Sequence, residues 1–364
     1  MYPLPSCTLV TCSYCFHNAT NTGVRTADEL LASMESVLAI PTYIVIYCDA
    51  TMATRIRARR EALEFMSITR IIEAPFESLW CYPFLETVRR NREEYWPSKD
   101  GRTNSETHLI QCNKFDFVLS VLRENPFSTE KFAWIDSCCQ ENMRKICEDY
   151  SHAKLMYILK NSSDKFHIQA LNVCDKKYML AENKREYYEH YQWVVCGSFF
   201  TCGKLSGEKI LGKLKEIVSS TTNLGYGHGE EMFYLEVLDD PDISLGYGDY
   251  GQILNNFIAP TRNIRYILDY IARNYMRLGY HKECYRCCEI VLRQIENYII
   301  SVDDDVYMGF LFCLYLSGYY HMGKTRGAEI VQHIRNLISI NPELRREYEK
   351  QRGFYEEQFM HVNR

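Results

Sequence analysis

The clearest hydrophobic pattern in the chain is a short apolar run that ends on a carboxylate. Residues 132–135 read Phe-Ala-Trp-Ile, and Asp136 follows them before a polar stretch. Such a run is typical of a strand that is buried on both faces, as in a parallel sheet. Because open α/β sheets bind ligands at the carboxyl ends of their strands, Asp136 is a candidate binding residue. Capping of a following helix is the alternative interpretation of Asp136.

Apolar runs and helical spacing alternate upstream of this strand. Strands are predicted at residues 8–14, 43–49 and 69–73, with helices between them at 28–39 and 55–65. Strand, helix and strand in this order imply a right-handed parallel αβ arrangement. A further helix, from Lys114 to Glu124, leads into the strand that ends at Asp136, with Asn113 as its expected cap.

The pattern downstream of Asp136 combines strands with glycine-rich turns. Strands are predicted at residues 155–159, 167–171 and from 193 onward, and helices at 141–149 and 206–219. The strand that starts at Trp193 is expected to run into a loop bounded by Gly197 and Gly203. A second glycine-rich turn, residues 225–229, is expected to open a helix at Glu230.

The character of the chain changes at Arg262. Amphipathic helices are predicted at residues 266–278, 281–298, 306–322 and 326–340, with hinges at Gly279 and Gly323. Their pairing resembles tetratricopeptide-type helical hairpins, although the spacing exceeds the roughly 34 residues of that repeat. The sequence therefore predicts a mixed α/β domain at 1–261 and an all-α domain at 262–364. The second domain is expected to serve packing, self-association or binding of a protein partner.

Composition narrows the function classes. The chain has 364 residues and a net charge of -5, which argues against a general nucleic-acid-binding protein. Its 16 cysteines lack the spacing of a disulfide framework or a zinc site, and its first residues lack a signal-peptide pattern. We therefore expect reduced thiols and a cytoplasmic location. No apolar run approaches the roughly 20 residues that span a bilayer.

Nucleotide-binding fingerprints are missing from the sequence. It has no Gly-x-x-x-x-Gly-Lys-Ser/Thr loop, no Gly-x-Gly-x-x-Gly after the first strand and no Gly-x-Ser-x-Gly elbow. A nucleotide held through a metal ion and a strand-end carboxylate fits the sequence better than one cradled by a phosphate loop.

Several segments taken together resemble one family. They are the first strand (8–16), 112–118, 125–127, 132–136, 196–203, 227–231 and 247–250. In this order they resemble the HtrL/YibB (WlaTC) family over roughly the first 260 residues. Members of that family occur near bacterial surface-polysaccharide genes and in large DNA viruses, so a viral origin would place the protein in the host cytoplasm. The family is similar to glycosyltransferases of the GT-A fold, which implies a GT-A-like, Rossmann-like mixed sheet.

The resemblance implies a site for a nucleotide-sugar donor, with a UDP-sugar as the expected donor. Tyr14 is expected to stack on the base, Asp49 to bond the base or ribose, and Lys114 to pair with the diphosphate. The full implied donor set is Thr11, Cys12, Tyr14, Asp49, Lys114, Trp134, Asp136, Gly197 and Ser198. The alternative to a binding role for Lys114 is an exposed surface position. The alternative for Gly197 is an ordinary tight turn.

The resemblance also implies Mn²⁺ or Mg²⁺ bound by an Asp-x-Asp motif. Here the motif reads Asp136-Ser137-Cys138, and cysteine is a poor ligand for a hard cation. The metal would depend on Asp136 together with Asp249 or His228, or be weakly held, or be absent.

An acidic pair, Glu230 and Glu231, stands where GT-A enzymes place a catalytic carboxylate. Neighbouring residues on a helix point about 100° apart, so only one of the two can face the sugar. Glu231 is expected to be the base that takes a proton from the acceptor hydroxyl, and Glu230 to hold the acceptor. Stabilisation of a helix N-terminus by acidic side chains is the alternative.

The sequence thus predicts a glycosyltransferase that moves a sugar from a nucleotide diphosphate to a hydroxyl of a glycan or protein acceptor. The alternative is a binding module without turnover, which Cys138 in place of an acid favours. A two-metal phosphodiesterase or nuclease would require a denser cluster of carboxylates and histidines than the sequence contains.

Overall fold

The computed structural model describes most of the chain. The described residues are 4, 6–16, 25–95, 104–138, 151–189, 193–225, 229–248, 254, 257, 264–298 and 300–363. The chain divides into two compact units. Unit 1 comprises Met1–Ala170, Lys176–Leu245 and Tyr250–Leu254; unit 2 comprises Leu171–Asp175, Gly246–Asp249 and Asn255–Arg364.

Unit 1 is built on one mixed sheet. Seven described strands lie in the order β3-β2-β1-β4-β6-β5-β7. Their bounds are β1 Cys7–Ser13, β2 Ile44–Cys48, β3 Thr69–Glu73, β4 Lys131–Ile135, β5 Phe166–Ala170, β6 Val195–Gly203 and β7 Ile243–Tyr247. The pairs β1–β2, β2–β3 and β1–β4 are parallel, whereas β6 is antiparallel to both β4 and β5. The predicted fold class, a mixed α/β sheet followed by a helical region, is confirmed.

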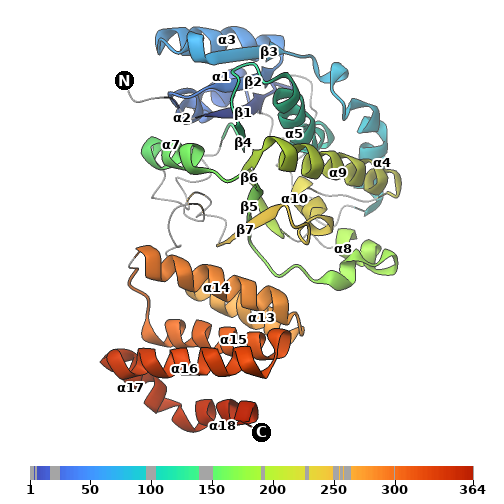
Figure 1. The fold of residues 1–364 in the computed structure, drawn as a ribbon. Helices are drawn as coiled ribbons and strands as arrows, with labels where there is room; N and C mark the ends of the chain where they lie inside the picture. The colour runs from blue at the N-terminus through green and yellow to red at the C-terminus, as the bar shows by residue number, and fades with distance from the viewer. Residues whose placement is uncertain are drawn as a thin grey trace. The chain divides into compact units, whose positions relative to one another are not determined.

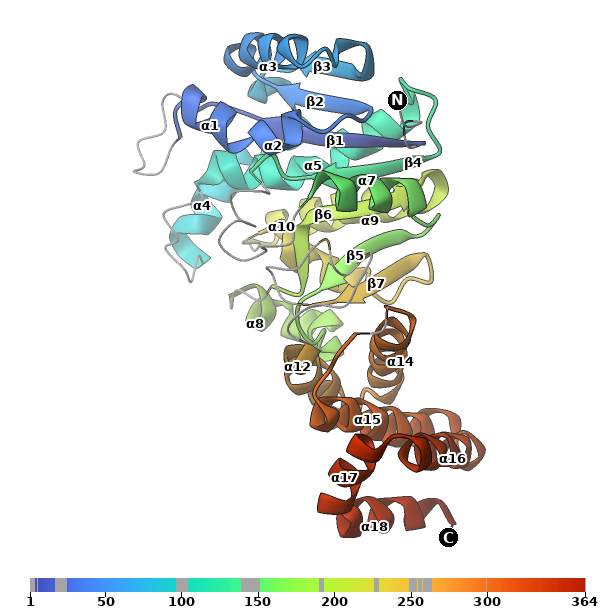
Figure 2. The ribbon, with the colours of Figure 1, turned by 90° about the vertical axis from the view of Figure 1, so that its left-hand side faces the viewer.

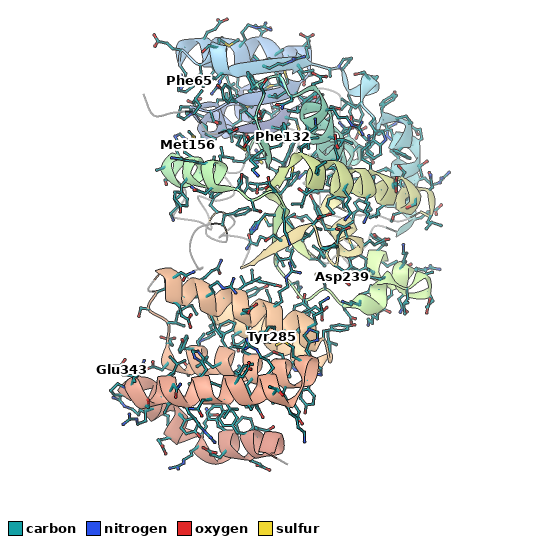
Figure 3. All side chains as sticks on the ribbon, in the orientation of Figure 1. Phe65, Phe132, Met156, Asp239, Tyr285 and Glu343 are labelled. Carbon is teal, nitrogen blue, oxygen red and sulfur yellow. The ribbon has the colours of Figure 1, made fainter. Side chains whose placement is uncertain are left out.

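Helices cover both faces of this sheet. They are α1 Ala27–Ser33, α2 Glu35–Leu38, α3 Ala50–Ala62, α4 Leu85–Tyr95, α5 Ser105–Glu124, α7 His152–Asn161, α8 Lys184–Glu189, α9 Lys204–Asn223 and α10 Glu230–Phe233. Short 3₁₀ turns lie at Met66–Ile68, Phe76–Ser78, Tyr82–Phe84, Lys176–Met179, Ala181–Asn183 and Tyr234–Glu236. Figures 1 and 2 show α5 and α9 side by side on one face, with α2 and α7 on the other. Phe132 on β4 is consequently fully buried, as predicted for a strand covered on both faces (Figure 3).

Three local predictions in unit 1 are wrong. Residues 155–159 lie in helix α7, which Ser151 caps by accepting from the Lys154 backbone N–H at 3.1 Å. Asn113 lies inside α5, whose cap is Asn104. The stretch from Gly197 to Gly203 continues strand β6 and forms no loop. The helix predicted at 141–149 lies outside the described residues.

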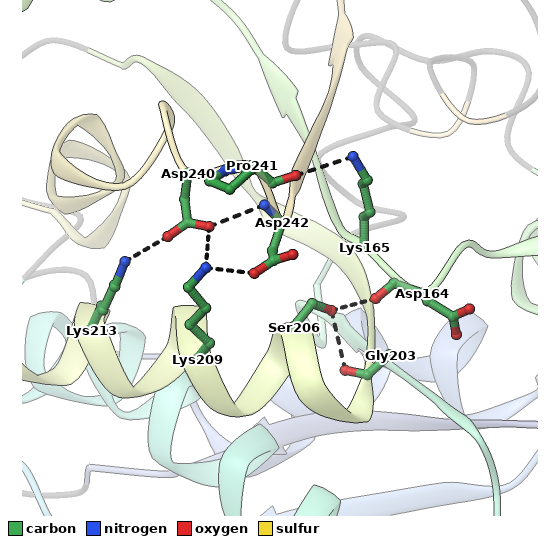
Figure 4. Close-up of polar contacts among 9 residues, drawn as sticks. All are labelled: Asp164, Lys165, Gly203, Ser206, Lys209, Lys213, Asp240, Pro241 and Asp242. Carbon is green, nitrogen blue, oxygen red and sulfur yellow. Dashed lines mark hydrogen bonds and ion pairs between the residues drawn. The ribbon is translucent and has the colours of Figure 1, made fainter.

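Ion pairs close the turn between the 3₁₀ segment after α10 and strand β7. Lys209 on α9 donates to both Asp240 and Asp242, and Lys213 donates to the second oxygen of Asp240 (Figure 4). Ser206, at the start of α9, donates to the backbone oxygen of Asp164 at 2.5 Å. The lysine pairs hold α9 against the entry into β7, and the Ser206 bond holds the start of α9 against the segment before β5.

Unit 2 is a series of helices. They are α12 Ile264–Tyr266, a π-helical turn Ile267–Ala272, α13 Arg273–Arg277, α14 His281–Tyr298, α15 Asp304–Met322, α16 Lys324–Ile340, α17 Pro342–Lys350 and α18 Arg352–Asn363. Gly279 and Gly323, the predicted hinges, have φ of 77° and 91°, which glycine adopts without strain. Arg326 of α16 donates to the hydroxyl of Tyr285 on α14 at 2.7 Å. The helical character is confirmed, and the tetratricopeptide likeness stays a prediction.

No helix in the described part of the chain is both long and apolar enough to cross a bilayer.

Candidate active site

Lys114 is a buried charge at the centre of the candidate site. It lies in the interior of α5, and its side chain is 1% exposed. Its ammonium donates to Glu230 Oε1 at 2.7 Å, to the Gly197 carbonyl at 3.1 Å and to Asp136 Oδ1 at 3.2 Å. An ammonium has three protons to donate, so these acceptors use all of them. Lys114 thus joins α5, the end of β4, β6 and α10 at one point.

Asp136 is fixed on one side and open on the other. Its backbone N–H donates to the Ser198 carbonyl at 2.9 Å, which extends the pairing of β4 with β6 by one residue. Its Oδ1 accepts from the Trp134 indole at 2.7 Å as well as from Lys114. Its Oδ2 accepts no hydrogen bond from any residue that the structure describes, and the side chain is 27% exposed. Asp136 therefore presents one pre-oriented carboxylate oxygen to an incoming group.

The acidic pair lies at the first turn of α10, directly after Gly229. Both side chains are buried. Glu230 pairs with Lys114, whereas Glu231 accepts from the Gly197 backbone N–H at 3.0 Å. The two glutamates therefore have different partners, as expected for neighbouring residues on a helix.

Gly197 permits this close approach. A Cβ at this position would lie 2.5 Å from Glu230 Oε1 and 3.0 Å from Glu231 Cγ. Any larger residue would displace one or both carboxylates. Gly197 was expected to belong to the donor site; in the structure it lets the glutamates approach the backbone of β6.

The charges of the cluster shift the pKa values of its members. Burial alone would lower the pKa of Lys114, but the carboxylates of Asp136 and Glu230 hold it well above its ordinary value. Burial, and then the charge of Glu230, raise the pKa of Glu231 to about 8. Glu230 thus forms an ion pair with Lys114, whereas Glu231 favours its protonated form.

The predicted nucleoside residues lie at the ends of β1 and β2. Burial, and then the charge of Asp136, raise the pKa of Cys12, which places the end of β1 near the carboxylate cluster. Tyr14 packs its ring on Phe117, with centroids 6.2 Å apart. Among the described residues, the buried hydroxyls of Thr11, Ser13 and Tyr14 have no hydrogen-bond partner. Orphaned polar atoms of this kind cost free energy unless a water or ligand meets them.

Asp49 is already used within the fold. It caps α3 by accepting from the Met52 N–H at 3.0 Å, and its other oxygen accepts from the Cys15 N–H. Contact with a base or ribose would have to add to these bonds, so the binding role of Asp49 stays a prediction.

The described residues do not suit a divalent cation. One oxygen of Asp136 is shared with an ammonium and an indole, and the half-buried Cys138 is a poor ligand for a hard cation. No group of three His, Cys, Asp or Glu side chains in the described segments could hold a metal ion. The other two predicted ligands, His228 and Asp249, lie outside the described residues.

The fold thus brings together Lys114, Trp134, Asp136, Gly197, Ser198, Glu230 and Glu231. Direct pairing of Lys114 with a diphosphate stays a prediction; in the structure its side chain is buried and its ammonium has three acceptors. Ser13, the last residue of β1, lies within the predicted nucleoside stretch from Thr11 to Tyr14.

Comparison with known proteins adds distant likenesses. No family model and no curated protein matches the sequence. Among solved structures, a 4-diphosphocytidyl-2C-methyl-D-erythritol synthase from Anaerococcus prevotii is similar, with 11% identity and a TM-score of 0.32 over 75% of this chain and 96% of that one. Mouse xyloside xylosyltransferase 1 is similar at 10% identity and a TM-score of 0.34, over 65% of this chain and 83% of that one. A mannose-1-phosphate geranyltransferase from Thermus thermophilus shows 8% identity and a TM-score of 0.30, over 66% and 73%. At these values the likeness carries no functional argument, and the proposal below depends on the geometry of the site.

Proposed function

We propose that the chain transfers a sugar from a nucleotide diphosphate, with UDP-sugar as the donor, to a hydroxyl of a glycan or protein. The observation that carries this proposal is the pairing of Asp136 and Glu230 with Lys114 at the carboxyl end of β4, with Glu231 next to them on the Gly197 backbone N–H. Strand ends of open α/β sheets are where ligands bind. The orphaned hydroxyls of β1 beside this cluster provide polar groups for a nucleoside.

Each acid has a distinct part in the proposed reaction. Glu231 takes the proton of the acceptor hydroxyl, whose oxygen then bonds to the anomeric carbon as the bond from that carbon to the diphosphate breaks. Glu230 holds the acceptor through its second oxygen, which accepts no bond from the described residues. Asp136 orients the donor sugar through its open oxygen. The part of a metal ion stays a prediction, because His228 and Asp249 lie outside the described residues.

Lys114 is a positioning residue in this scheme. Without its charge, the carboxylates of Asp136 and Glu230 would repel each other at the site. With it, both carboxylates are held in place before a substrate arrives, which is the condition for electrostatic preorganisation.

A binding module without turnover is the second candidate. The burial of both glutamates favours it, because an acceptor must reach Glu231. Release of UDP from a panel of UDP-sugars, with and without simple glycoside acceptors, decides between the two. Turnover by the wild type that is abolished in Glu231→Gln and kept in Glu236→Gln supports the transferase. Absence of turnover from every donor supports the binding module.

A further inference from the structure

An open groove on unit 1 lies apart from the carboxylate site. Its walls are α5 and α9, with Trp80 at one side, and its volume is about 500 Å³. This volume falls within the range of small-molecule sites. Arg123, which lines the groove, is nine residues beyond Lys114 on α5, or about 13 Å along the helix axis. The groove is therefore a separate site.

The aromatic wall of the groove is held in one orientation. The ammonium of Lys215 lies 4.7 Å from the centroid of the Trp80 ring, and Lys215 is itself ion-paired with Asp116. Phe84 contacts the same indole edge-to-face, with centroids 5.8 Å apart. A half-buried tryptophan fixed in this way offers apolar surface to a ligand at little entropic cost.

Two opposite charges in the lining are not used within the fold. Arg123 and Glu216 both line the groove, and neither forms an ion pair or hydrogen bond with a described residue. Arginine supplies several N–H donors, and a carboxylate supplies only acceptors. Because Lys215 is balanced by Asp116, the lining has a net charge near zero, which disfavours a phosphate or a nucleotide.

The floor of the groove is open. Gly212 faces it from the middle of α9, and a Cβ built there would meet no atom within 4 Å. About two turns further along α9, Ser219 donates its hydroxyl proton to the Lys215 carbonyl at 2.9 Å, so its oxygen can still accept a bond from a ligand.

We propose that this groove binds a neutral saccharide, one or two pyranose residues of a glycan. The apolar C–H face of the sugar packs on Trp80, and its hydroxyls accept from Arg123 and donate to Glu216. Hydroxyl groups both donate and accept, which matches a lining with an unpaired donor and an unpaired acceptor. The proposal does not depend on transfer at Asp136, although such a groove would also retain a glycan acceptor.

Saturation-transfer NMR tests the proposal with four neutral disaccharides: cellobiose, lactose, chitobiose and xylobiose. Gly212→Gln fills the groove without a clash and removes a glycine from a helix interior, so folding is expected to be kept. Gly353→Gln is the matched control, because Gly353 on α18 also has no atom within 4 Å of a built Cβ. Arg123→Gln, at an exposed position, is a second variant.

The expected result is binding of at least one disaccharide, weakened at least tenfold in Gly212→Gln and in Arg123→Gln and unchanged in Gly353→Gln. Equal binding by wild type and Gly212→Gln overturns the proposal, as does the lack of signal from all four sugars. Binding of acidic disaccharides alone overturns the assignment to neutral sugars. If the wild type binds a disaccharide in the groove but turns over no UDP-sugar, the result counts against the proposed transfer and still supports the groove.

Discussion

The ammonium of Lys114 lies 2.7 Å from Glu230 Oε1, and these two buried side chains are 116 positions apart in the chain. The contact joins α5, which precedes β4, to α10, which follows α9. It requires that segments on both sides of β4 and β6 are packed together, so the geometry of the site depends on the tertiary fold of unit 1.

Replacement of Lys114 by methionine is expected to destabilise unit 1 strongly. It leaves the buried Glu230 without a counter-charge, which typically costs about 3–5 kcal/mol. Urea denaturation measures the change in the free energy of unfolding. Lys213→Met serves as the control, because the side chain of Lys213 is 47% exposed and its ion pair is worth about 1 kcal/mol or less. Equal losses of stability from the two substitutions would refute the stabilising role of the ion pair between Lys114 and Glu230.

Gly197→Ala is expected to disable the site while the fold survives. The added methyl group would overlap Glu230 Oε1 and press on Glu231, and overpacking of this kind costs about 1–3 kcal/mol. Turnover of UDP-sugar is expected to fall at least tenfold, because the base moves away from its position. In Gly353→Ala, which meets no neighbouring atom, turnover should be unchanged. Retention of full turnover by Gly197→Ala would show that the glutamates need not approach β6.

Glu231 is expected to make stability fall with rising pH. Its folded-state pKa is raised above the ordinary value of 4.5, to about 8, so between these values the folded chain binds more protons than the unfolded one. The stabilisation is present below the unfolded pKa and is lost as pH rises toward about 8. Turnover should rise over the same range as the base form appears. Melting temperatures of wild type and Glu231→Gln between pH 5 and 9 should converge at low pH and show a steeper decline for the wild type; parallel curves would contradict the shift.

Asp240 is expected to make stability fall as the pH is lowered, the opposite of the effect of Glu231. Burial alone would raise its pKa, but bonds from Lys209 and Lys213 lower it to about 2 (Figure 4). A depressed pKa contributes stability above the unfolded value of 3.8, and this contribution is lost as pH falls toward 2. Asp240→Asn should therefore lower the melting temperature at pH 6 and have little effect at pH 2. An equal loss at both pH values would point to packing instead of charge.

The sequence alone predicts the positions of those strands that are short, apolar and bounded by polar residues. The strand ending at Asp136 and the strands β1 and β2 lie within one residue of their predicted bounds, because burial on both faces leaves a strong pattern. Residues 155–159 show the limit of that signal: a five-residue apolar run suits a strand or one face of a helix. Ser151 identifies the run as part of helix α7, because its side chain accepts from the Lys154 backbone N–H and so caps the helix.

The arrangement of the site was less accessible from sequence. Asn113 looked like a cap because the helix was assumed to begin there, whereas Asn104 starts it and Asn113 is buried. Burial of Lys114 could not be foreseen, since a lysine is buried only when long-range partners neutralise it. Those partners, Asp136 and Glu230, come from segments whose distance in space no local pattern encodes.

Calorimetric titration with UDP tests the central claim most directly. The account predicts that the wild type binds UDP and that Asp136→Ala weakens binding at least tenfold, with EDTA or with Mn²⁺ present. Asp164→Ala, which removes a carboxylate that is 92% exposed, should bind as the wild type does. Lack of binding by the wild type, or equal affinity of wild type and Asp136→Ala, would contradict a nucleotide-sugar site at this strand end.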